Sequence, residues 1–125
     1  MKYIISAVVA AFMVTTACAK AHQWTPTYPK FEPSYIKGIM VTSMKLFNKR
    51  SDVSFYEISV YDEDWKPIVF ATSSKIVEVG HLEKKNVEIY VLEKDCNRIE
   101  YICTTSKILA DEEGNGINSR ICSKV

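Results

Sequence analysis

The stretch from Arg98 to Val125 constrains the fold of this chain more than any other. Two runs rich in isoleucine, tyrosine, threonine and valine flank a segment of acidic residues and glycines, Asp111–Gly116. This arrangement is typical of a β-hairpin. Cys103 and Cys122 are placed almost symmetrically about the segment, so the hairpin register brings them opposite each other or nearly so. Opposed residues of antiparallel strands have Cα atoms about 4.5–5.5 Å apart, within the span of a disulfide. We therefore predict a Cys103–Cys122 bridge.

The first residues have the composition of an export signal. Lys2 is followed by an apolar run, Tyr3–Val14, which is short for a membrane-spanning helix. Small residues come next and offer A-x-A cleavage sites that end at Ala19 and at Ala21. We expect residues 1–19 to be a signal peptide, with cleavage after one of these two alanines, and the protein to be periplasmic or secreted.

Cys18 offers an alternative to full cleavage. Ala17-Cys18 ends like a bacterial lipobox, although Thr15 stands where an aliphatic residue is usual. Lipidation at Cys18 would make the protein a membrane-anchored lipoprotein, and an uncleaved signal would anchor it by its first segment.

Removal of the signal leaves roughly one hundred residues, the size of one domain. In an oxidising compartment a Cys103–Cys122 bridge would persist. Cys96 then has no assigned partner, and it could be a free thiol, an intermolecular partner or a competitor for Cys103.

The charges of the chain are balanced and interspersed. There are 16 lysines and arginines against 15 aspartates and glutamates, which gives a formal net charge of +1. No basic stripe is present, so we expect no nucleic-acid partner.

Residues 20–33 carry three prolines, at Pro26, Pro29 and Pro33. Proline fixes φ and removes a backbone donor, so this segment is predicted to be an extended arm in front of the domain, which would cover residues 34–125. The arm would pack one aromatic residue on the domain; the alternative is that Trp24 or Tyr28 binds a ligand.

The rest of the chain is predicted to form about seven or eight short strands with no convincing helix. The side chains of Tyr56, Ile58 and Val60 alternate with those of the opposite face, as in a half-buried strand. The predicted strands and strand-rich runs are 35–47 (with a core strand at Ile39–Phe47), Val53–Tyr61, Ile68–Phe70, Lys75–Val79, Asn86–Leu92 and the two arms of the closing hairpin. Short strands at this spacing favour an all-β, immunoglobulin-like sandwich of about seven strands.

Catalytic and metal-binding residues are sparse. His22 and His81 are the only histidines, and no nucleophile with an adjacent base is apparent, so we expect no enzyme activity and no cofactor. The alternating oxygens of Asp111, Glu113 and Asn115 resemble a calcium loop, but the twelfth position is a cysteine. Solvated acids at a hairpin tip explain this pattern equally well, and we predict no metal site.

The last strand has two chemically different faces. Ile117, Ile121 and Val125 fall on one, and Arg120 and Lys124 fall on the other. The apolar face either packs on the core or is available for strand addition to another chain.

The order of these elements resembles the N-terminal domain of the periplasmic chaperones that assemble pili and capsular fibres. The resemblance covers about Phe31 to Val125 and rests on loose motifs. These are Tyr35-Ile36-Lys37, Leu46-Phe47-Asn48 before a polar turn, Phe55–Tyr61 running into Asp62-Glu63-Asp64-Trp65-Lys66-Pro67-Ile68, the loop and strand Leu82–Val91, and the closing hairpin. Part of that family has a disulfide between the last two strands of this domain, which Cys103 and Cys122 match.

The resemblance implies a protein partner. In the family, the last strand lends alternating apolar side chains to an incomplete pilin subunit, which here would be those of Ile117, Ile121 and Val125. Two basic residues hold the carboxylate of the subunit, and the matching positions are Lys37 for the first and Arg120 or Lys124 for the second. Arginine can bind a carboxylate through two hydrogen bonds.

The family has two such domains, whereas this sequence has room for one. We therefore expect a stand-alone, chaperone-like domain that binds a pilin-like or envelope subunit. The alternative is a structural envelope component without chaperone activity.

Overall fold

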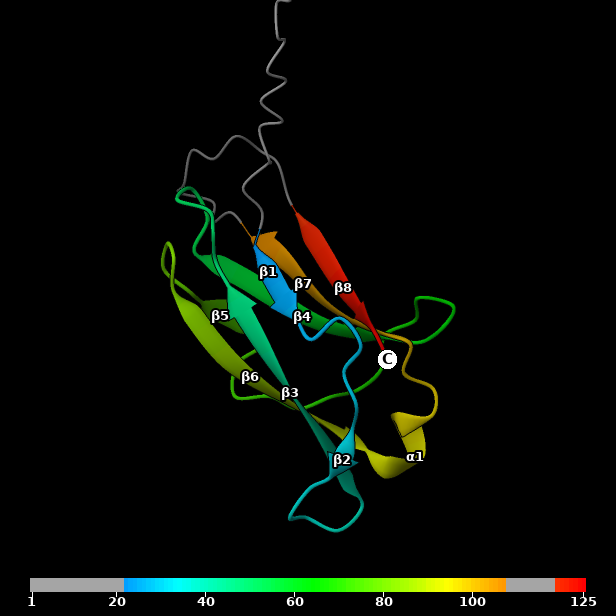
Figure 1. The fold of residues 1–125 in the computed structure, drawn as a ribbon. Helices are drawn as coiled ribbons and strands as arrows, with labels where there is room; N and C mark the ends of the chain where they lie inside the picture. Colours follow the sequence, from blue (N-terminus) through cyan, green and yellow to red (C-terminus); the bar gives the residue numbers. More distant parts are fainter. Residues whose placement is uncertain (1–21, 108–118) are drawn as a thin grey trace, which may run out of the picture.

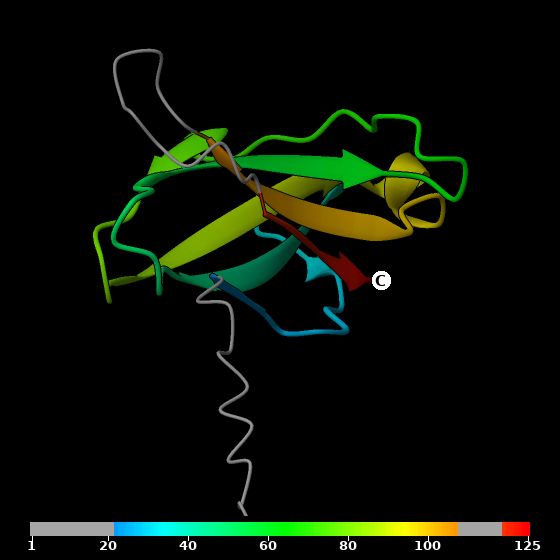
Figure 2. The same ribbon diagram turned by 90° about the horizontal axis from the view of Figure 1, so that it is seen from above.

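The computed structural model describes residues 22–107 and 119–125, which form two packed antiparallel sheets (Figures 1 and 2). The strands are β1 (Gln23–Thr25), β2 (Glu32–Pro33), β3 (Ile39–Phe47), β4 (Phe55–Tyr61), β5 (Ile76–Glu78), β6 (Lys84–Leu92), β7 (Tyr101–Lys107) and β8 (Arg120–Lys124). The one helix of the described residues is a single turn, α1 (Glu93–Cys96). The expected all-β sandwich is confirmed. The proposed signal peptide, Cys18, the calcium-like loop and Ile117 lie outside the described residues.

The first sheet is built on β3. This strand pairs with β6 along its whole length, from Ile39 opposite Leu92 to Phe47 opposite Lys84. On its other side β3 pairs with β1 and with β2 at two separate places. From Thr42 in β3 and from Val87 in β6 onward, buried side chains alternate with more exposed ones, because successive residues of a strand point to opposite faces.

The second sheet has the strand order β5-β4-β7-β8, in which every neighbouring pair is antiparallel. The predicted face of Tyr56, Ile58 and Val60 is buried, and it packs against Val87, Ile89 and Val91 and others of the first sheet within one core cluster. Figure 2 shows the two sheets as two layers, and the side chains of the core cluster come from both of them.

Residues 22–33 are part of the sandwich. Three residues of β1 pair with β3, and Trp24 is only 4% exposed, in the core. The Trp24 indole N–H donates a hydrogen bond of 3.1 Å to the carbonyl of Ile102, in the other sheet. Most of the segment lies outside regular pairing, but β1 and β2 are strands of the first sheet and precede residue 34, where the domain was predicted to begin.

Two further elements differ from the sequence predictions. Ile68–Phe70 is not a strand, although the Ile68 N–H still donates to the Val60 carbonyl and holds the segment against β4. The helical turn α1 was not predicted, and it connects β6 to the segment before β7. Its short length explains why no helical periodicity is visible in the sequence.

A buried asparagine organises the turns at one end of the sandwich. The Asn48 side-chain amide donates to the carbonyls of Val53 and Val79 at 2.7 and 2.8 Å. Its oxygen accepts from the Arg50 N–H and from the Tyr56 hydroxyl. Burial raises the pKa of Tyr56 to about 12, so this hydroxyl stays protonated and can donate. A hydrogen-bonded amide can be buried in a core without a large penalty.

Candidate binding surface around the last strand

The strand β8 forms an edge of the second sheet and carries most of the residues that the sequence singled out. It pairs with β7, and in this register Cys103 is directly opposite Cys122. The two sulfurs are bonded, with an S–S distance of 2.05 Å and a Cα–Cα distance of 4.0 Å. Cys96 is the free cysteine of the described residues; burial raises the pKa of its thiol, with a smaller contribution from Glu93, and this favours the protonated form.

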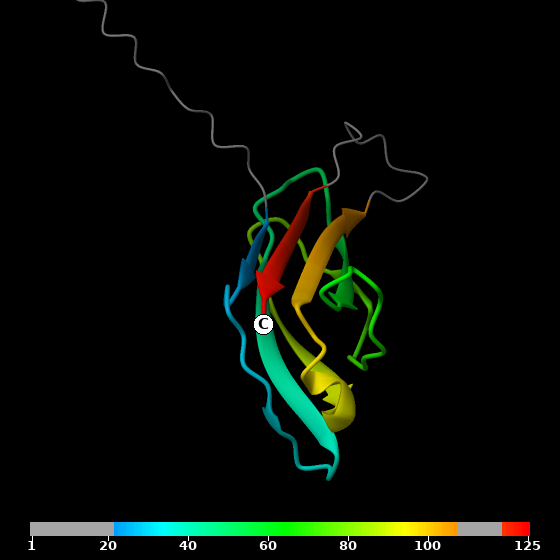
Figure 3. The same cartoon turned by 90° about the vertical axis from the view of Figure 1, so that its right-hand side faces the viewer.

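Residues 22–27 run alongside the outer edge of β8, so the two ends of the described chain are neighbours (Figure 3). His22 contacts Ser119, the Ser123 hydroxyl donates to the Pro26 carbonyl, and the Lys124 N–H donates to the Thr27 carbonyl. The first two pairs are each 97 residues apart in sequence, and the third has the same spacing. A constant difference means that the two segments run parallel.

His22 is buried where this segment meets the core. Its ring nitrogens lie 2.8 Å from the Thr104 hydroxyl and 3.1 Å from the Ser119 hydroxyl, and its ring lies 4.6 Å from that of Tyr56. Burial lowers the pKa of His22 to about 4; the hydrogen bond to Thr104 opposes this shift, and the charge of Arg50 adds to it. The histidine is therefore neutral in the folded protein at neutral pH.

This burial makes the stability of the protein depend on pH. The pKa of His22 is about 4 when folded and 6.5 for the free side chain, so between these values only the unfolded chain takes up the proton. The free energy of unfolding should be at its full value above pH 6.5 and should fall by up to about 3 kcal/mol as the pH approaches 4. Urea unfolding at pH 7.5 and 4.5, with His22→Gln as reference, measures this.

The difference in stability between the natural protein and His22→Gln should shrink at pH 4.5, because the variant lacks the titrating group. The matched control is His81→Gln, which removes an exposed histidine. A difference that is the same at both pH values would contradict the prediction.

The apolar face of β8 turns toward the core. Ile121 packs against the core cluster and Ser123 is buried, while Val125, after the end of the strand, is 37% exposed. The side chain of Ile121 is thus already in contact within the sandwich. Strand addition at this edge would therefore use the backbone and the outer face more than the side chain of Ile121.

The outer face of β8 carries a cation packed on aromatic rings. The guanidinium carbon of Arg120 lies 4.7 Å from the ring centre of Tyr61 and 5.0 Å from that of Trp65. Trp65 is stacked on Tyr101 with 4.0 Å between ring centres and 4° between planes. We call Tyr61, Trp65, Tyr101 and Arg120 the aromatic–arginine cluster. Arg120 Nη2 also donates to Cys103 Sγ at 3.9 Å. A guanidinium has five N–H donors, so an arginine held on aromatic rings can still bind a ligand through the others.

The structure separates the predicted carboxylate-binding residues. Lys124 lies near the aromatic–arginine cluster in sequence, and its ammonium group is 3.5 Å from Glu100. Lys37 is in the turn between β2 and β3, at the lower end of the molecule in Figures 1 and 3, whereas β8 occupies the upper half. Arg120 and Lys124 thus share one strand, and Lys37 is not brought to them.

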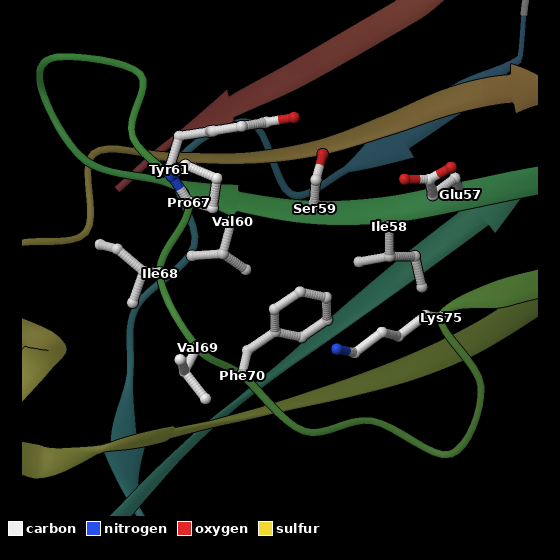
Figure 4. A pocket seen from close by; sticks show the side chains of 10 residues that line it. All are labelled: Glu57, Ile58, Ser59, Val60, Tyr61, Pro67, Ile68, Val69, Phe70 and Lys75. Carbon is white, nitrogen blue, oxygen red and sulfur yellow. The ribbon is translucent and has the colours of Figure 1, made fainter.

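A cavity lies beside β4, away from β8. Figure 4 shows Ile58, Val60 and Phe70 along a cavity of about 360 Å³, with Lys75 pointing toward Phe70. The Lys75 ammonium group is 5.1 Å from the centre of the Phe70 ring. The lining is mostly apolar, with the polar side chains of Glu57, Ser59 and Lys75 at its margin.

The part of the chain that the structure describes shows neither a metal-binding cluster nor a membrane-spanning helix. No group of three or more histidine, cysteine, aspartate or glutamate side chains is arranged to hold a metal ion. No described helix has the length and apolar character needed to cross a membrane.

No protein-family model matches the chain, and no curated protein matches it in sequence. A solved structure does resemble it: the E. coli chaperone DraB superposes with a TM-score of 0.55 and 14% sequence identity. The match covers 82% of this chain and 52% of that one, so the chain spans about half the length of DraB. The chain has a chaperone-like fold. At this identity the likeness concerns the fold alone.

The aromatic–arginine cluster was not predicted from the sequence. Its residues come from β4, from the turn that follows it, and from β7 and β8. Tyr61 and Tyr101 are opposite each other on β4 and β7. Predicting the cluster would have required knowing the register of these two strands, which are distant in sequence. Trp65 has a φ of 61°, a left-handed turn conformation that nothing in its own residue type predicts.

Proposed function

We propose that this protein is an exported, chaperone-like immunoglobulin-type domain that binds a protein partner and has no catalytic role. The observation that carries the proposal is the aromatic–arginine cluster on the outer face of β8, an edge strand. The fold likeness to the chaperone DraB supports a binding role. The leader-like first residues and the Cys103–Cys122 bridge support export to an oxidising compartment.

Arg120 is the proposed anchor for a carboxylate of the partner. Its guanidinium rests on Tyr61 and Trp65, which limits its side-chain freedom before a ligand arrives. Charge-assisted hydrogen bonds from arginine to a carboxylate are about twice as strong as neutral ones. Lys124 adds a second cation four residues further along the strand, on the same face, although Glu100 already neutralises part of its charge.

The backbone of β8 is the proposed site of strand addition. Its outer edge is faced by residues 22–27, but the Lys124–Thr27 hydrogen bond is the one backbone bond between these segments in the described residues. Arg120 and Cys122 alternate along the strand with the residues that bond to β7, as Lys124 does. Their N–H groups therefore point away from β7, like that of Lys124. A partner strand would pair with these groups beside the arginine anchor, as in known cases of strand addition.

Peptide binding tests this proposal. The probe is a 12-residue peptide of alternating valine and threonine, used with a free C-terminal carboxylate and as the C-terminal amide. We expect Arg120→Ala to weaken binding of the carboxylate form by about tenfold, the effect of losing a hydrogen bond to a charged group, and to leave binding of the amide unchanged. Calorimetric titration of both peptides measures this.

Arg120→Lys serves as the charge-conserving variant, since it keeps the cation but loses the planar fork. Lys45→Ala, on the exposed face of the other sheet, is the matched control. Equal affinity for the carboxylate and the amide, or equal affinity of the natural protein and Arg120→Ala, would overturn the assignment of the anchor.

A further inference from the structure

The strand β6 leaves its outer edge largely unpaired. It is nine residues long and hydrogen-bonds to β3 on one side. On the other side, its bonds within the described residues are the two that Tyr90 exchanges with Ala71. In Figure 1, β6 forms the margin of the sheet on the side away from β8. This edge is therefore distinct from the surface of the proposed function.

The outward groups of this edge follow from the position of Tyr90. Backbone groups of alternate residues point to the same side of a strand, so Lys84, Asn86 and Glu88 point outward with Tyr90. None of the three makes a backbone hydrogen bond to a described residue on that side. Among the described strands β6 pairs with β3 alone, and a cavity of about 340 Å³ lies between Lys85–Val87 and the segment around β5.

The charges along this edge are complementary to themselves. When two copies of β6 pair antiparallel about a twofold axis at Asn86, Lys84 of each copy is opposite Glu88 of the other. The side chains of Lys84 and Glu88 are both exposed on the outer face of the sheet. Directly opposed charges of opposite sign stabilise a strand pair, and like charges destabilise it. A register centred on Lys84 or on Lys85 would oppose two lysines, so the charges select the register at Asn86.

We propose that the β6 edge binds the β6 edge of a second copy of this chain. The sheet that contains β3 and β6 in one copy would then continue into the same sheet of the other copy across a twofold axis. The pairs formed by Lys84 with Glu88, by Asn86 with itself and by Glu88 with Lys84 supply up to about six backbone hydrogen bonds. A contact of this kind is isologous and closes on itself, which limits assembly to a dimer.

The lysines at this edge also explain why the pairing is specific. Charged residues, lysine above all, protect edge strands against indiscriminate pairing. When two β6 edges pair antiparallel about Asn86, the charge of Glu88 in one copy balances that of Lys84 in the other. Registers centred on Lys84 or Lys85 do not give this balance. The contacts that these side chains make within one copy leave both exposed: the Lys84 ammonium lies 5.4 Å from the Phe47 ring centre, and the Glu88 carboxylate accepts from the Tyr90 hydroxyl.

Sedimentation equilibrium over a range of concentrations tests the proposal. We expect a monomer–dimer equilibrium whose dissociation constant rises at least about tenfold in Glu88→Lys, because two attractive pairs become repulsive. The double variant Lys84→Glu with Glu88→Lys should restore the original constant to within about twofold. Glu63→Lys, in an exposed turn, makes the same change of charge away from β6 and should have no effect.

A cross-linking experiment fixes the register. In a Cys96→Ser background, Asn86→Cys should form a disulfide between two copies on mild oxidation, because residues opposed on a twofold axis lie within disulfide reach. Lys45→Cys, opposite Asn86 on the neighbouring strand β3, is one strand further from the axis and should not cross-link.

A natural protein that stays monomeric at millimolar concentration, or a dimer that Glu88→Lys leaves unchanged, would overturn the proposal. If Glu88→Lys does not fold, Lys84→Glu tests the same pair from its other member. A dimer weakened by Arg120→Ala and not by Glu88→Lys would place the contact at β8 instead. Arg120→Ala should otherwise leave the β6 dimer intact, so this proposal and the proposed function fail separately.

Discussion

Replacing Trp24 with alanine is expected to lower the free energy of unfolding by about 3–5 kcal/mol, the usual range for removing a buried tryptophan. Trp24 is 4% exposed and belongs to the core cluster, although it comes from a strand of only three residues. Its indole N–H also bridges from one sheet to the carbonyl of Ile102 in the other. The variant loses apolar burial and the hydrogen bond from the indole to the Ile102 carbonyl, and urea unfolding at pH 7.5 measures the sum.

Two further variants separate the contributions. Trp24→Phe keeps most of the apolar surface and removes the N–H donor, so we expect it to lose less than the alanine variant. Tyr28→Ala is the matched control, because Tyr28 is an aromatic residue of the same segment that is 73% exposed. If Trp24→Ala and Tyr28→Ala have similar stability, β1 is not anchored in the core as the structure shows.

Removing the Cys103–Cys122 bridge should lower stability by about 2–4 kcal/mol. The bridge closes a loop with a sequence separation of 19, and a loop of about this length is expected to contribute about 3 kcal/mol by restricting the unfolded chain. The double variant Cys103→Ala with Cys122→Ala tests this without leaving a thiol that could pair with Cys96. Comparison of the oxidised and the reduced natural protein should give the same difference.

The control for the bridge is Cys96→Ser, which leaves the disulfide in place and should change stability little. Equal melting temperatures of the oxidised and reduced protein would show that the bridge contributes nothing. A loss as large for Cys96→Ser as for the double variant would assign the effect to the wrong cysteine.

Local patterns predicted much of the fold. The alternation of Tyr56, Ile58 and Val60 gave the buried face of β4, because one face of a half-buried strand must be apolar. The predicted core strand Ile39–Phe47 coincides with β3. The hairpin position of Cys103 and Cys122 gave their pairing, because the register of a hairpin follows from the place of its turn.

The predictions were weakest where the structure depends on distant contacts. Trp24 is surrounded by polar residues and prolines, so no local pattern shows that its three-residue strand pairs with β3 and fills the core. The basic residues of the candidate site could be named by residue type and position in the chain. Their environments could not, because the rings under Arg120 come from β4 and from the turn after it.

The parallel contact between residues 22–27 and β8 has a consequence for the order of folding. The partners of His22 and Pro26 are 97 residues further along the chain, and the partner of Thr27 lies on β8. Contacts of such long sequence separation form slowly, because a long loop must close before they contribute. Until Ser119–Lys124 is available, the segment around Trp24 can pair with β3 but has nothing to close against on its other side. Without β8 the sandwich would therefore stay open at this edge, and formation of β8 is the event that would fix residues 22–27 in place.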